Sequence, residues 1–271
     1  MPRRRVSRPA LTARNADKHD LYQRSVQVPE ADIRLVERMY QRLNGELPRV
    51  LREDFCGTAL MASRWVAHRE GNRAIAVDLD PEPLAWGERM NRQPLGAHAS
   101  RLQLVRGDVR TVRVPHSDVT LAMNFSFYCF KERRDLVGYF RRARAGLKPG
   151  GLLLADAFGG PEAMEVLTER RRRDGFTYIW DQASFDSISH DIQAHIHFEF
   201  PDGSRLRRAF SYDWRLWGLP EIRDALAEAG FASVRILWET VDKKGRGTGV
   251  FREAVHADPC ESWVCCIVAQ R

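Results

Sequence analysis

Two patterns of hydrophobic and polar positions follow one another along the chain. Between residues 49 and 156, short apolar runs predict buried strands, and most stretches between them carry apolar residues at helical spacing. The predicted strands are 49–53, 73–78, 101–106, 118–124 and 151–156, and the predicted helices are 58–70, 81–93 and 131–147. Continuous apolar strands that alternate with amphipathic helices are typical of a parallel sheet covered on both faces. We therefore expect an open α/β fold.

The pattern changes after residues 158–160, which read Phe-Gly-Gly. Alternating strand-like runs follow, with a Pro-Asp-Gly turn at 201–203 between two of them. They predict an antiparallel β insertion at about 174–213. The α/β pattern then resumes with a helix at 219–231 and strands at 233–239 and 262–270.

The chain has 271 residues, of which 44% are hydrophobic, so it can bury the core of one domain with an insertion. Residues 17–44 precede the first strand and predict two helices. One face of the second helix carries Ile33, Val36, Met39, Tyr40 and Leu43. We expect an N-terminal tail and helical lid in residues 1–47 and a main domain in residues 48–271, with the insertion as its cap.

The formal net charge is +7, and Arg3, Arg4, Arg5 and Arg8 supply four of these charges from a tail that we expect to be floppy. The excess on the rest of the chain is mild, which argues against a nucleic-acid partner. Residues 170–173, all arginine, form the densest internal run of positive charge. We expect a solvated helix end there rather than a phosphate site.

Five cysteines without CxxC spacing predict reduced thiols rather than disulfides or a structural zinc site. His195 and His197 share a predicted strand face, but a histidine pair without nearby acids is more often a hairpin surface than a metal site. No apolar run is long enough for a membrane helix, and the N-terminus lacks the apolar stretch of a secretory signal. We expect a cytoplasmic protein with no metal and no membrane partner.

Acidic residues follow the first three predicted strands. Glu53 ends the first strand, Asp78 ends the second, and Asp108 follows the third. Because open α/β sheets bind ligands at the carboxyl ends of their strands, these acids predict a nucleotide site. Asp78 is placed to accept both hydroxyls of a ribose. Asp108 is placed to accept from the exocyclic amine of an adenine, with Val109 packed on the ring.

The same segments resemble motifs I to IV of class I methyltransferases dependent on S-adenosylmethionine. The first motif of that family reads acid-x-Gly-x-Gly-x-Gly, and residues 53–59 read Glu-Asp-Phe-Cys-Gly-Thr-Ala. The segments AVDLDPEPL and LKPGGLLLAD follow in order at the expected spacings, so the resemblance covers about residues 48–160. It implies a seven-stranded Rossmann-like sheet with helices on both faces and S-adenosylmethionine as cofactor. It also implies that Glu53 contacts the methionine end of the cofactor, Asp78 the ribose and Asp108 the adenine.

The first loop departs from the family's pattern. Phe55 and Ala59 replace two glycines, so we expect the backbone to approach the ligand chiefly at Gly57, with Thr58 as the N-cap of the next helix. No GxGxxG follows the first strand, which argues against a dehydrogenase. The residues expected to contact the cofactor are Tyr22, Glu53, Phe55, Cys56, Gly57, Thr58, Asp78, Leu79, Asp108, Val109, Asn124 and Phe125.

Three residues are expected to act in methyl transfer: Tyr22, Asn124 and Tyr128. Residues 123–130 leave the fourth strand at the edge that would hold the cofactor. Asn124 is similar to the first residue of the family's Asn-Pro-Pro-Tyr motif, although Pro-Pro is missing, and the aromatic residues here can equally be core residues. Tyr22 lies in the helical segment that folds over the cofactor in many small-molecule methyltransferases, and a tyrosine docked on the core is the alternative.

Two further groups are candidates for recognising a substrate. The tryptophans can form an aromatic wall suited to an amine that becomes more cationic on methylation, or they can simply be packing. They are Trp180, Trp214, Trp217 and Trp238. The loop 242–261 returns to the ligand face if the last strand runs opposite to its neighbours, and a solvated loop is the alternative. Its charged candidates are Arg252, Glu253, His256, Asp258 and Glu261.

The sequence thus favours transfer of a methyl group to a small molecule, most readily to an amine nitrogen, and it identifies no general base. One alternative is a methyltransferase that acts on RNA or protein, whose affinity would fall steeply with salt. The other is a non-catalytic regulatory or scaffold protein with the same fold. The antiparallel insertion can pair with another subunit as easily as cap a pocket, which leaves a homodimer open.

Overall fold

The computed structural model describes residues 10–243, 245 and 247–271. Arg3, Arg4, Arg5 and Arg8 of the predicted tail lie outside the described residues, as do Lys244 and Arg246 of the predicted loop. The chain divides into two compact units. The insertion unit consists of Met1–Gln27 and Glu165–Asp213, and the main unit consists of Val28–Met164 and Trp214–Arg271.

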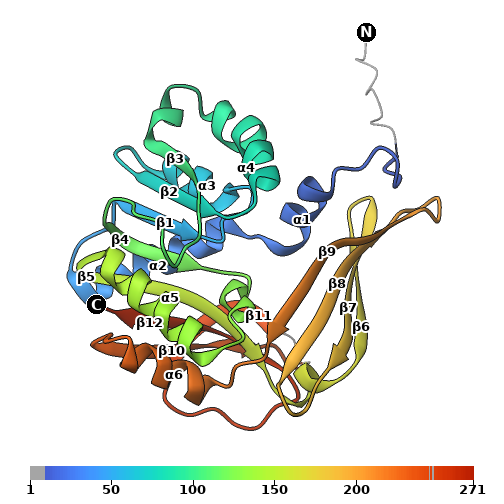
Figure 1. The fold of residues 1–271 in the computed structure, drawn as a ribbon. Helices are drawn as coiled ribbons and strands as arrows, with labels where there is room; N and C mark the ends of the chain where they lie inside the picture. The colour runs from blue at the N-terminus through green and yellow to red at the C-terminus, as the bar shows by residue number, and fades with distance from the viewer. Residues whose placement is uncertain (1–9, 244, 246) are drawn as a thin grey trace. The chain divides into compact units, whose positions relative to one another are not determined.

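The main unit contains an eight-stranded mixed sheet (Figure 1). Its strands are β1 (Val50–Asp54), β2 (Arg73–Asp78), β3 (Leu102–Arg106), β4 (Ser117–Ala122), β5 (Leu147–Gly159), β10 (Ser233–Val241), β11 (Gly247–Ala254) and β12 (Trp263–Gln270). Across the sheet they follow the order β11-β10-β12-β5-β4-β1-β2-β3. Neighbours from β3 to β5 pair in parallel, whereas β12 is antiparallel to both β5 and β10. The predicted open α/β fold and the reversed last strand are confirmed.

The expectation of seven strands was one strand short. Gly247–Ala254, part of the predicted loop 242–261, forms β11, which pairs with β10 in antiparallel fashion. The hydroxyls of Thr240 and Thr248 lie 2.6 Å apart across the pair, and Phe251 packs against the core. Glycine-rich sequence has little strand propensity of its own, so the hairpin partner, and not the local pattern, makes this strand.

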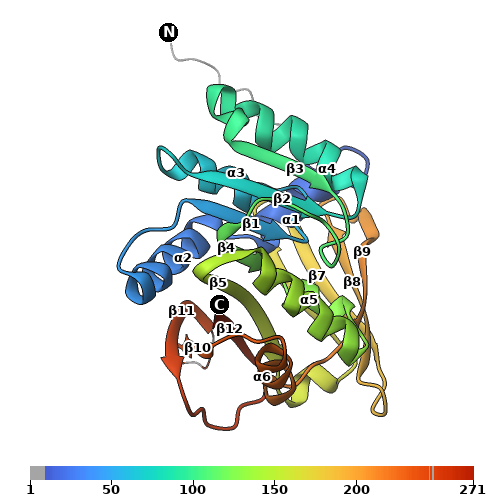
Figure 2. The ribbon, with the colours of Figure 1, turned by 60° about the vertical axis from the view of Figure 1, so that its left-hand side comes forward.

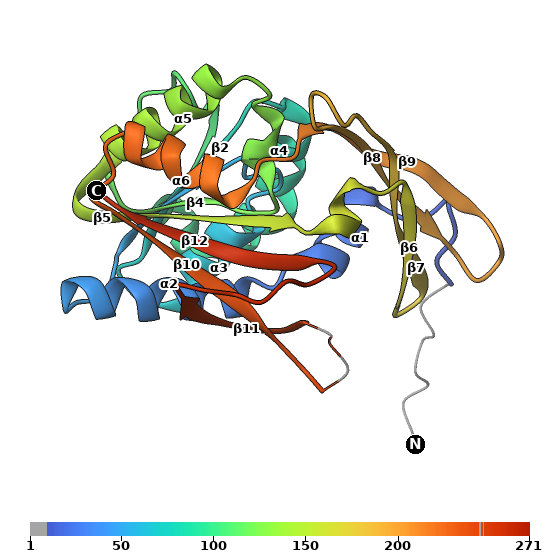
Figure 3. The same cartoon turned by 90° about the horizontal axis from the view of Figure 1, so that it is seen from below.

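Helices cover both faces of the main sheet, with α2 and α3 on one face and α5 and α6 on the other (Figures 2 and 3). The helices are α2 (Pro29–Asn44), α3 (Leu60–His68), α4 (Pro81–Gly87), α5 (Arg133–Gly146) and α6 (Leu219–Glu228). Short helical turns are η1 (Glu88–Arg92), η2 (Gln93–Arg101), η3 (Ser126–Cys129) and η4 (Pro161–Met164). Within the described ranges, no helix combines the length and apolar character needed to cross a membrane.

One predicted helix keeps its bounds and another starts later than expected. Residues 81–93 are helical, as α4 followed by η1, and the regular helix gives way to η2 where Pro94 lacks a backbone donor and Gly96 has a positive φ of 58°. The helix predicted at 58–70 begins at Leu60. Its N-cap is Ala59, which has no side chain to cap the helix, so the prediction of Thr58 as the N-cap was wrong.

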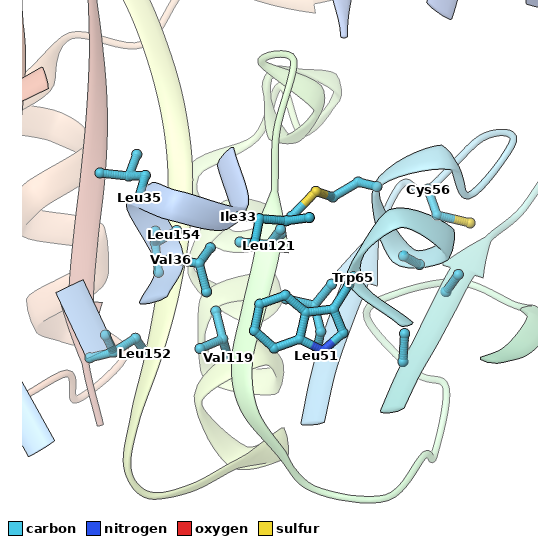
Figure 4. Packing of buried hydrophobic residues seen from close by; sticks show 14 of the residues in the cluster. Ile33, Leu35, Val36, Leu51, Cys56, Trp65, Val119, Leu121, Leu152 and Leu154 are labelled. Atoms are coloured by element: carbon cyan, nitrogen blue, oxygen red, sulfur yellow. The ribbon is translucent and has the colours of Figure 1, made fainter. Parts of the chain in front are cut away.

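The core of the main unit lies between α2, α3 and the sheet. The predicted apolar face of α2 is confirmed, since Ile33, Val36, Met39 and Tyr40 are buried and Leu43 packs against them. Figure 4 shows Ile33 and Val36 with Trp65 of α3 beside alternate strand residues. These are Leu51, Val119, Leu121, Leu152 and Leu154. Residues two apart share a strand face, so one face of each strand supplies this cluster.

The insertion unit contains a four-stranded sheet in the order β6-β7-β8-β9. Its strands are β6 (Leu167–Arg173), β7 (Phe176–Phe185), β8 (Asp191–Glu199) and β9 (Arg205–Arg215). The pairs β6–β7 and β7–β8 are antiparallel, as predicted for the insertion. Helix α1 (Lys18–Val26) packs its fully buried Leu21 in a cluster with Phe176, Ile196 and Phe198 of this sheet.

The prediction of a helix end at residues 170–173 was wrong, because these arginines lie in β6. Arg170 pairs with Ile179 and Arg173 with Phe176 across the β6–β7 hairpin. Gly175, with a left-handed φ of 84°, makes the turn. Pairing with the apolar β7 overrides the local charge pattern from which a helix end was predicted.

Candidate cofactor site

The loop after β1 is tied to the end of β2. The carboxylate of Asp78 accepts the backbone N–H of Gly57 at 2.7 Å, and the carbonyl of Val77 accepts the N–H of Cys56 at 3.0 Å. The structure therefore brings Asp78 and the first loop together at the carboxyl edge of the sheet, as the sequence predicts for a ligand loop.

Three residues of this loop have left-handed backbones. Phe55, Gly57 and Ala59 have φ values of 56°, 52° and 55°. These are the three positions at which the family motif has glycine, and a side chain in this conformation costs about 1 kcal/mol. Phe55 and Ala59 thus keep the geometry of the glycine loop without its glycines. Gly87 allows α4 to pack closely against the first loop, because a Cβ at this position would overlap the carbonyl group of Thr58.

Glu53 lies at the end of β1 and is buried, with 8% of its surface exposed. One of its carboxyl oxygens accepts the backbone N–H of Ala62 at 2.9 Å. Burial raises the pKa of Glu53 to about 8 despite this hydrogen bond, and the negative charge of Asp78 adds to the increase. A cationic group placed against Glu53 would favour its ionised form.

A cavity of about 450 Å³ opens at the carboxyl ends of β1, β2 and β3. Five residues predicted from the sequence line it, namely Phe55, Asp78, Leu79, Asp108 and Val109. The other lining residues are Gly107, Arg110, Cys129, Phe130, Lys131, Glu132 and Asp135. Leu79 is 66% exposed. Small-molecule sites occupy roughly 300–1,000 Å³, so the cavity is of a suitable size.

Arg110 is a lining residue that the sequence analysis missed. Its backbone N–H and guanidinium donate to both carboxylate oxygens of Asp108 at 2.7 to 3.2 Å. These hydrogen bonds hold the pKa of Asp108 below its ordinary value. The guanidinium also lies 5.3 Å from the ring centre of Phe130. The sequence hinted at this ion pair only through the opposite charges of Asp108 and Arg110, two residues apart.

The turn after β4 is held by Asp156, which the sequence analysis also missed. Asn124 and Phe125 both have a left-handed φ of 59°. Their backbone N–H groups donate to the two carboxylate oxygens of Asp156 at 2.9 and 2.8 Å. Burial raises the pKa of Asp156 to about 7. Asp156 follows the apolar run LLLA at 152–155. It could therefore have been recognised in the same way as Glu53 and Asp78, as an acid at the end of an apolar run.

Tyr128 lies in the core, with no exposed surface. Its hydroxyl donates to the carbonyl of Phe158 at 2.9 Å, and the two rings stack 5.3 Å apart. Neither Tyr128 nor Asn124 nor Phe125 lines the cavity. The predicted roles of these three residues in methyl transfer or cofactor binding stay predictions, as do those of Cys56 and Thr58, which are buried in the first loop.

Tyr22 belongs to α1 in the insertion unit. Its ring lies 5.0 Å from that of Phe210, and its hydroxyl interacts with that of Tyr212. The contact that the sequence analysis expects between Tyr22 and the cofactor stays a prediction.

The predicted tryptophan wall does not form as a single group within the main unit. Trp214 lies 6.5 Å from Phe125, whereas the buried Trp217 donates to the carbonyl of Phe130. The ring of Trp238 lies 5.2 Å from that of Trp263, with the two rings tilted by 35°. Trp180 belongs to the insertion unit, where it lies 5.8 Å from Tyr212.

The charged candidates of residues 242–261 do not line the cavity. Glu253 of β11 pairs with Arg42 at 2.9 Å, and His256 lies 4.0 Å from Asp258 with both exposed. Arg252 faces Trp238 in the pairing of β11 with β10. Glu261 contributes its carbonyl oxygen to the N–H of Glu162.

The histidine pair has an acidic neighbour that the sequence analysis did not foresee. His197 lies 3.2 Å from Asp181 of β7, and His195 lies 2.8 Å from the hydroxyl of Ser211. Across the described ranges, no group of three or more His, Cys, Asp or Glu residues is arranged to hold a metal ion.

A family model described as a methyltransferase domain matches residues 55–151. A malonyl-[acyl-carrier protein] O-methyltransferase of Xylella fastidiosa (strain M23) is 28% identical over 188 residues, which cover 68% of this chain. The chain spans 59% of the length of that relative.

Solved structures of similar fold cover nearly the whole chain. An S-adenosylmethionine-dependent methyltransferase from Clostridium acetobutylicum ATCC 824 has a TM-score of 0.66 at 15% identity, covering 93% of this chain and 96% of its own. DesVI of Streptomyces venezuelae has a TM-score of 0.66 at 18% identity, covering 94% and 98%. The sugar N-methyltransferase KedS8 from Streptoalloteichus sp ATCC 53650 has a TM-score of 0.62 at 19% identity, covering 100% and 98%.

Proposed function

We propose that the chain transfers a methyl group from S-adenosylmethionine to a small-molecule acceptor, because a methyltransferase-domain model matches residues 55–151 and the fold is similar to that of an S-adenosylmethionine-dependent methyltransferase. The observation that carries the proposal is the cavity at the ends of β1 to β3, which Asp78, Asp108 and Val109 line together. Its residues are of the kind that recognise a ribose and an adenine. The space beside Gly57 supports the fit, because a Cβ added there would meet no atom within 4 Å.

Five residues have separate tasks in this proposal, namely Asp78, Leu79, Asp108 and Val109, which line the cavity, and Glu53. The oxygens of Asp78 accept the N–H groups of Gly57 and Asp80, and a carboxylate has lone pairs left for two ribose hydroxyls. The exposed Leu79 and the buried Val109 offer apolar surface to the adenine, and Asp108 offers an acceptor. Glu53 binds the ammonium group at the methionine end.

The proposed acceptor is an amine nitrogen. Glu53, Asp78 and Asp156 lie at or near the carboxyl ends of β1, β2 and β5, and the negative charge of Asp32 in α2 raises the pKa of both Glu53 and Asp156. An edge rich in carboxyl groups favours a cationic acceptor over an anionic one. This supports a nitrogen acceptor, as in the sugar N-methyltransferase, over the oxygen acceptor of the malonyl-[acyl-carrier protein] O-methyltransferase.

When bound, the cofactor supplies a methyl group on a sulfonium, which is transferred by in-line displacement. The chain therefore has to orient the acceptor and exclude water. Asp156 fixes the turn of Asn124 and Phe125, which we propose to flank the transferred methyl group. The predicted lid function of Tyr22 belongs to the same proposal.

Calorimetric titration of S-adenosylmethionine into the wild type and Asp78→Ala tests the proposal. We expect micromolar binding by the wild type and a loss of about tenfold or more in the variant, since it lacks the ribose acceptor. Asp80→Ala is the matched control, because Asp80 caps α4 through the N–H of Glu82 but does not line the cavity. A folded wild type that does not bind would favour the non-catalytic scaffold.

Incubation with S-adenosylmethionine and a panel of amines, including amino sugars, tests the acceptor. We expect S-adenosylhomocysteine and a product in which a methyl group has replaced one hydrogen of the amine, detected by mass spectrometry. Turnover of carboxylic acids alone would contradict the amine. If instead the protein binds RNA, and this binding weakens steeply as the salt concentration rises, an RNA acceptor would be favoured. The homodimer and the cytoplasmic location stay predictions.

A further inference from the structure

Phe55 has a side chain at a position where the backbone favours glycine. Its φ of 56° lies in the left-handed region, and the next two residues are held by hydrogen bonds to Val77 and Asp78. Phenylalanine rarely adopts this conformation, so the surroundings must compensate for it. The contacts of the phenyl ring indicate which interactions compensate for the strained backbone of Phe55.

The ring of Phe55 packs against two other aromatic rings of the main unit. It lies 5.8 Å from Phe130 and 5.4 Å from Tyr139, and these two rings lie 5.2 Å from each other. Phe130, like Phe55, lines the cavity, whereas Tyr139 is fully buried. The three rings therefore form one aromatic surface with two of its members facing the cavity.

A buried network of hydrogen bonds is connected to this aromatic surface through Tyr139. The hydroxyl of Tyr139 donates to Asp54 at 3.1 Å, and Asp54 accepts from Arg52 at 2.7 Å. Arg52 in turn reaches the carbonyl of Val109 at 3.3 Å. Arg52, Asp54 and Tyr139 have almost no exposed surface. The network thus connects the ring supporting Phe55 with another lining residue, which makes the wall rigid.

We infer that the ring of Phe55 is a wall of the cofactor site, against which the adenosine half of the bound cofactor rests. This inference depends on the proposed function. A glycine at this position, as in the family motif, would supply the loop but no such surface. Aromatic side chains bind bases through their π-faces, so Phe55 would contribute to affinity through the nucleoside and not through the methionine.

Phe55→Gly and Ala59→Gly form a matched pair of variants. Both give a left-handed position its preferred residue, but Ala59 is buried and does not line the cavity. We expect Phe55→Gly to weaken S-adenosylmethionine binding about tenfold or more, as base stacking contributes on this scale. Ala59→Gly should bind within about twofold of the wild type. Equal affinities for the two variants would overturn the inference.

Binding of 5′-methylthioadenosine shows which part of the cofactor Phe55 contacts, because this probe keeps the nucleoside but lacks the amino acid part. We expect Phe55→Gly to lose binding of the probe by the same factor as binding of the cofactor. Loss for the cofactor alone would show that the ring only shapes the loop, and would refute the inference. If Phe55→Gly does not fold, Phe55→Leu decides, since it keeps an apolar side chain without a flat ring. A wild type that binds neither ligand would instead defeat the proposed function.

Discussion

The loop after β1 and the turn after β4 leave neighbouring strands of the same sheet, and both contain left-handed residues that are not glycine. They are Phe55 and Ala59 in the first case and Asn124 and Phe125 in the second. In each case a carboxylate at or near the end of the adjacent strand accepts one or two backbone N–H groups of the segment. Asp78 of β2 holds the first, and Asp156 of β5 holds the second.

The two acids differ in what else they face. Asp78 lines the cavity, so the acid that holds the loop is also offered to a ligand. Asp156 does not line it, and each of its oxygens accepts an N–H of the turn. An acid at a strand end is therefore not by itself a ligand residue. The shape of the neighbouring segment decides whether the acid lines the cavity or only positions the backbone.

Asp156→Ala should have the largest effect on stability. It leaves the N–H groups of Asn124 and Phe125 without an acceptor, and we expect the free energy of unfolding to fall by about 3 kcal/mol in urea titrations. Asp156→Asn keeps one acceptor oxygen and should lose about half as much. An Asp156→Ala protein as stable as the wild type would show that the turn holds itself, and the comparison with Asp78 would fail.

Stability should also depend on pH, through carboxyl groups whose pKa values burial raises. Asp32, Asp156 and Glu53 reach about 6, 7 and 8. Because the unfolded values are lower, this contribution is fully present below about pH 4 and is lost as pH rises through the folded values. Allowing for solvent screening, we expect the free energy of unfolding to fall by about 2 kcal/mol from pH 5 to pH 8.

Asp156→Asn separates the turn from the rest of this pH dependence. The variant cannot ionise at position 156, so the part of the decrease near pH 7 should shrink, while the parts due to Asp32 and Glu53 remain. Urea titrations of the wild type and of Asp156→Asn at several pH values measure the free energy of unfolding of each. A stability that is flat or rises with pH in the wild type would contradict the assignment.

Replacement of left-handed residues by glycine compares the strain of the two segments. Ala59→Gly should stabilise the protein by about 1 kcal/mol, because alanine avoids this region of φ. Asn124→Gly should change the stability by less than about 0.5 kcal/mol, since asparagine tolerates it. Thermal unfolding of both variants measures the difference. Equal gains would mean that Asn124 is as strained as Ala59.

The smallest effect is expected at Arg110. Arg110→Ala removes the guanidinium that lowers the pKa of Asp108, so the pKa of that carboxyl should rise toward its ordinary value. Global stability should change by less than about 0.5 kcal/mol, because the pair is partly exposed. Titration of Asp108 by NMR measures the shift, and Arg113→Ala is a control for the lost charge. An unchanged pKa would mean that Arg110 does not orient Asp108 in solution.

Much of the main unit could be predicted from local sequence. Apolar runs placed five parallel strands, and the face of α2 followed from helical spacing, because both patterns depend on residues close in the chain. The errors came from distant partners. Residues 170–173 and 247–254 were not recognised as strands, since β7 and β10 supply the pairing that makes them so.

The candidate site divides in the same way. The sequence alone determined that acids stand at strand ends, including Glu53, Asp78 and Asp108, because the end of an apolar run is visible in the chain. Only the tertiary structure decided that Asp108 is held by Arg110 and that Asp156 serves the turn after β4. It also decided that Phe55 faces the cavity. These outcomes depend on side-chain directions and on hydrogen bonds between separate segments, which no local pattern records.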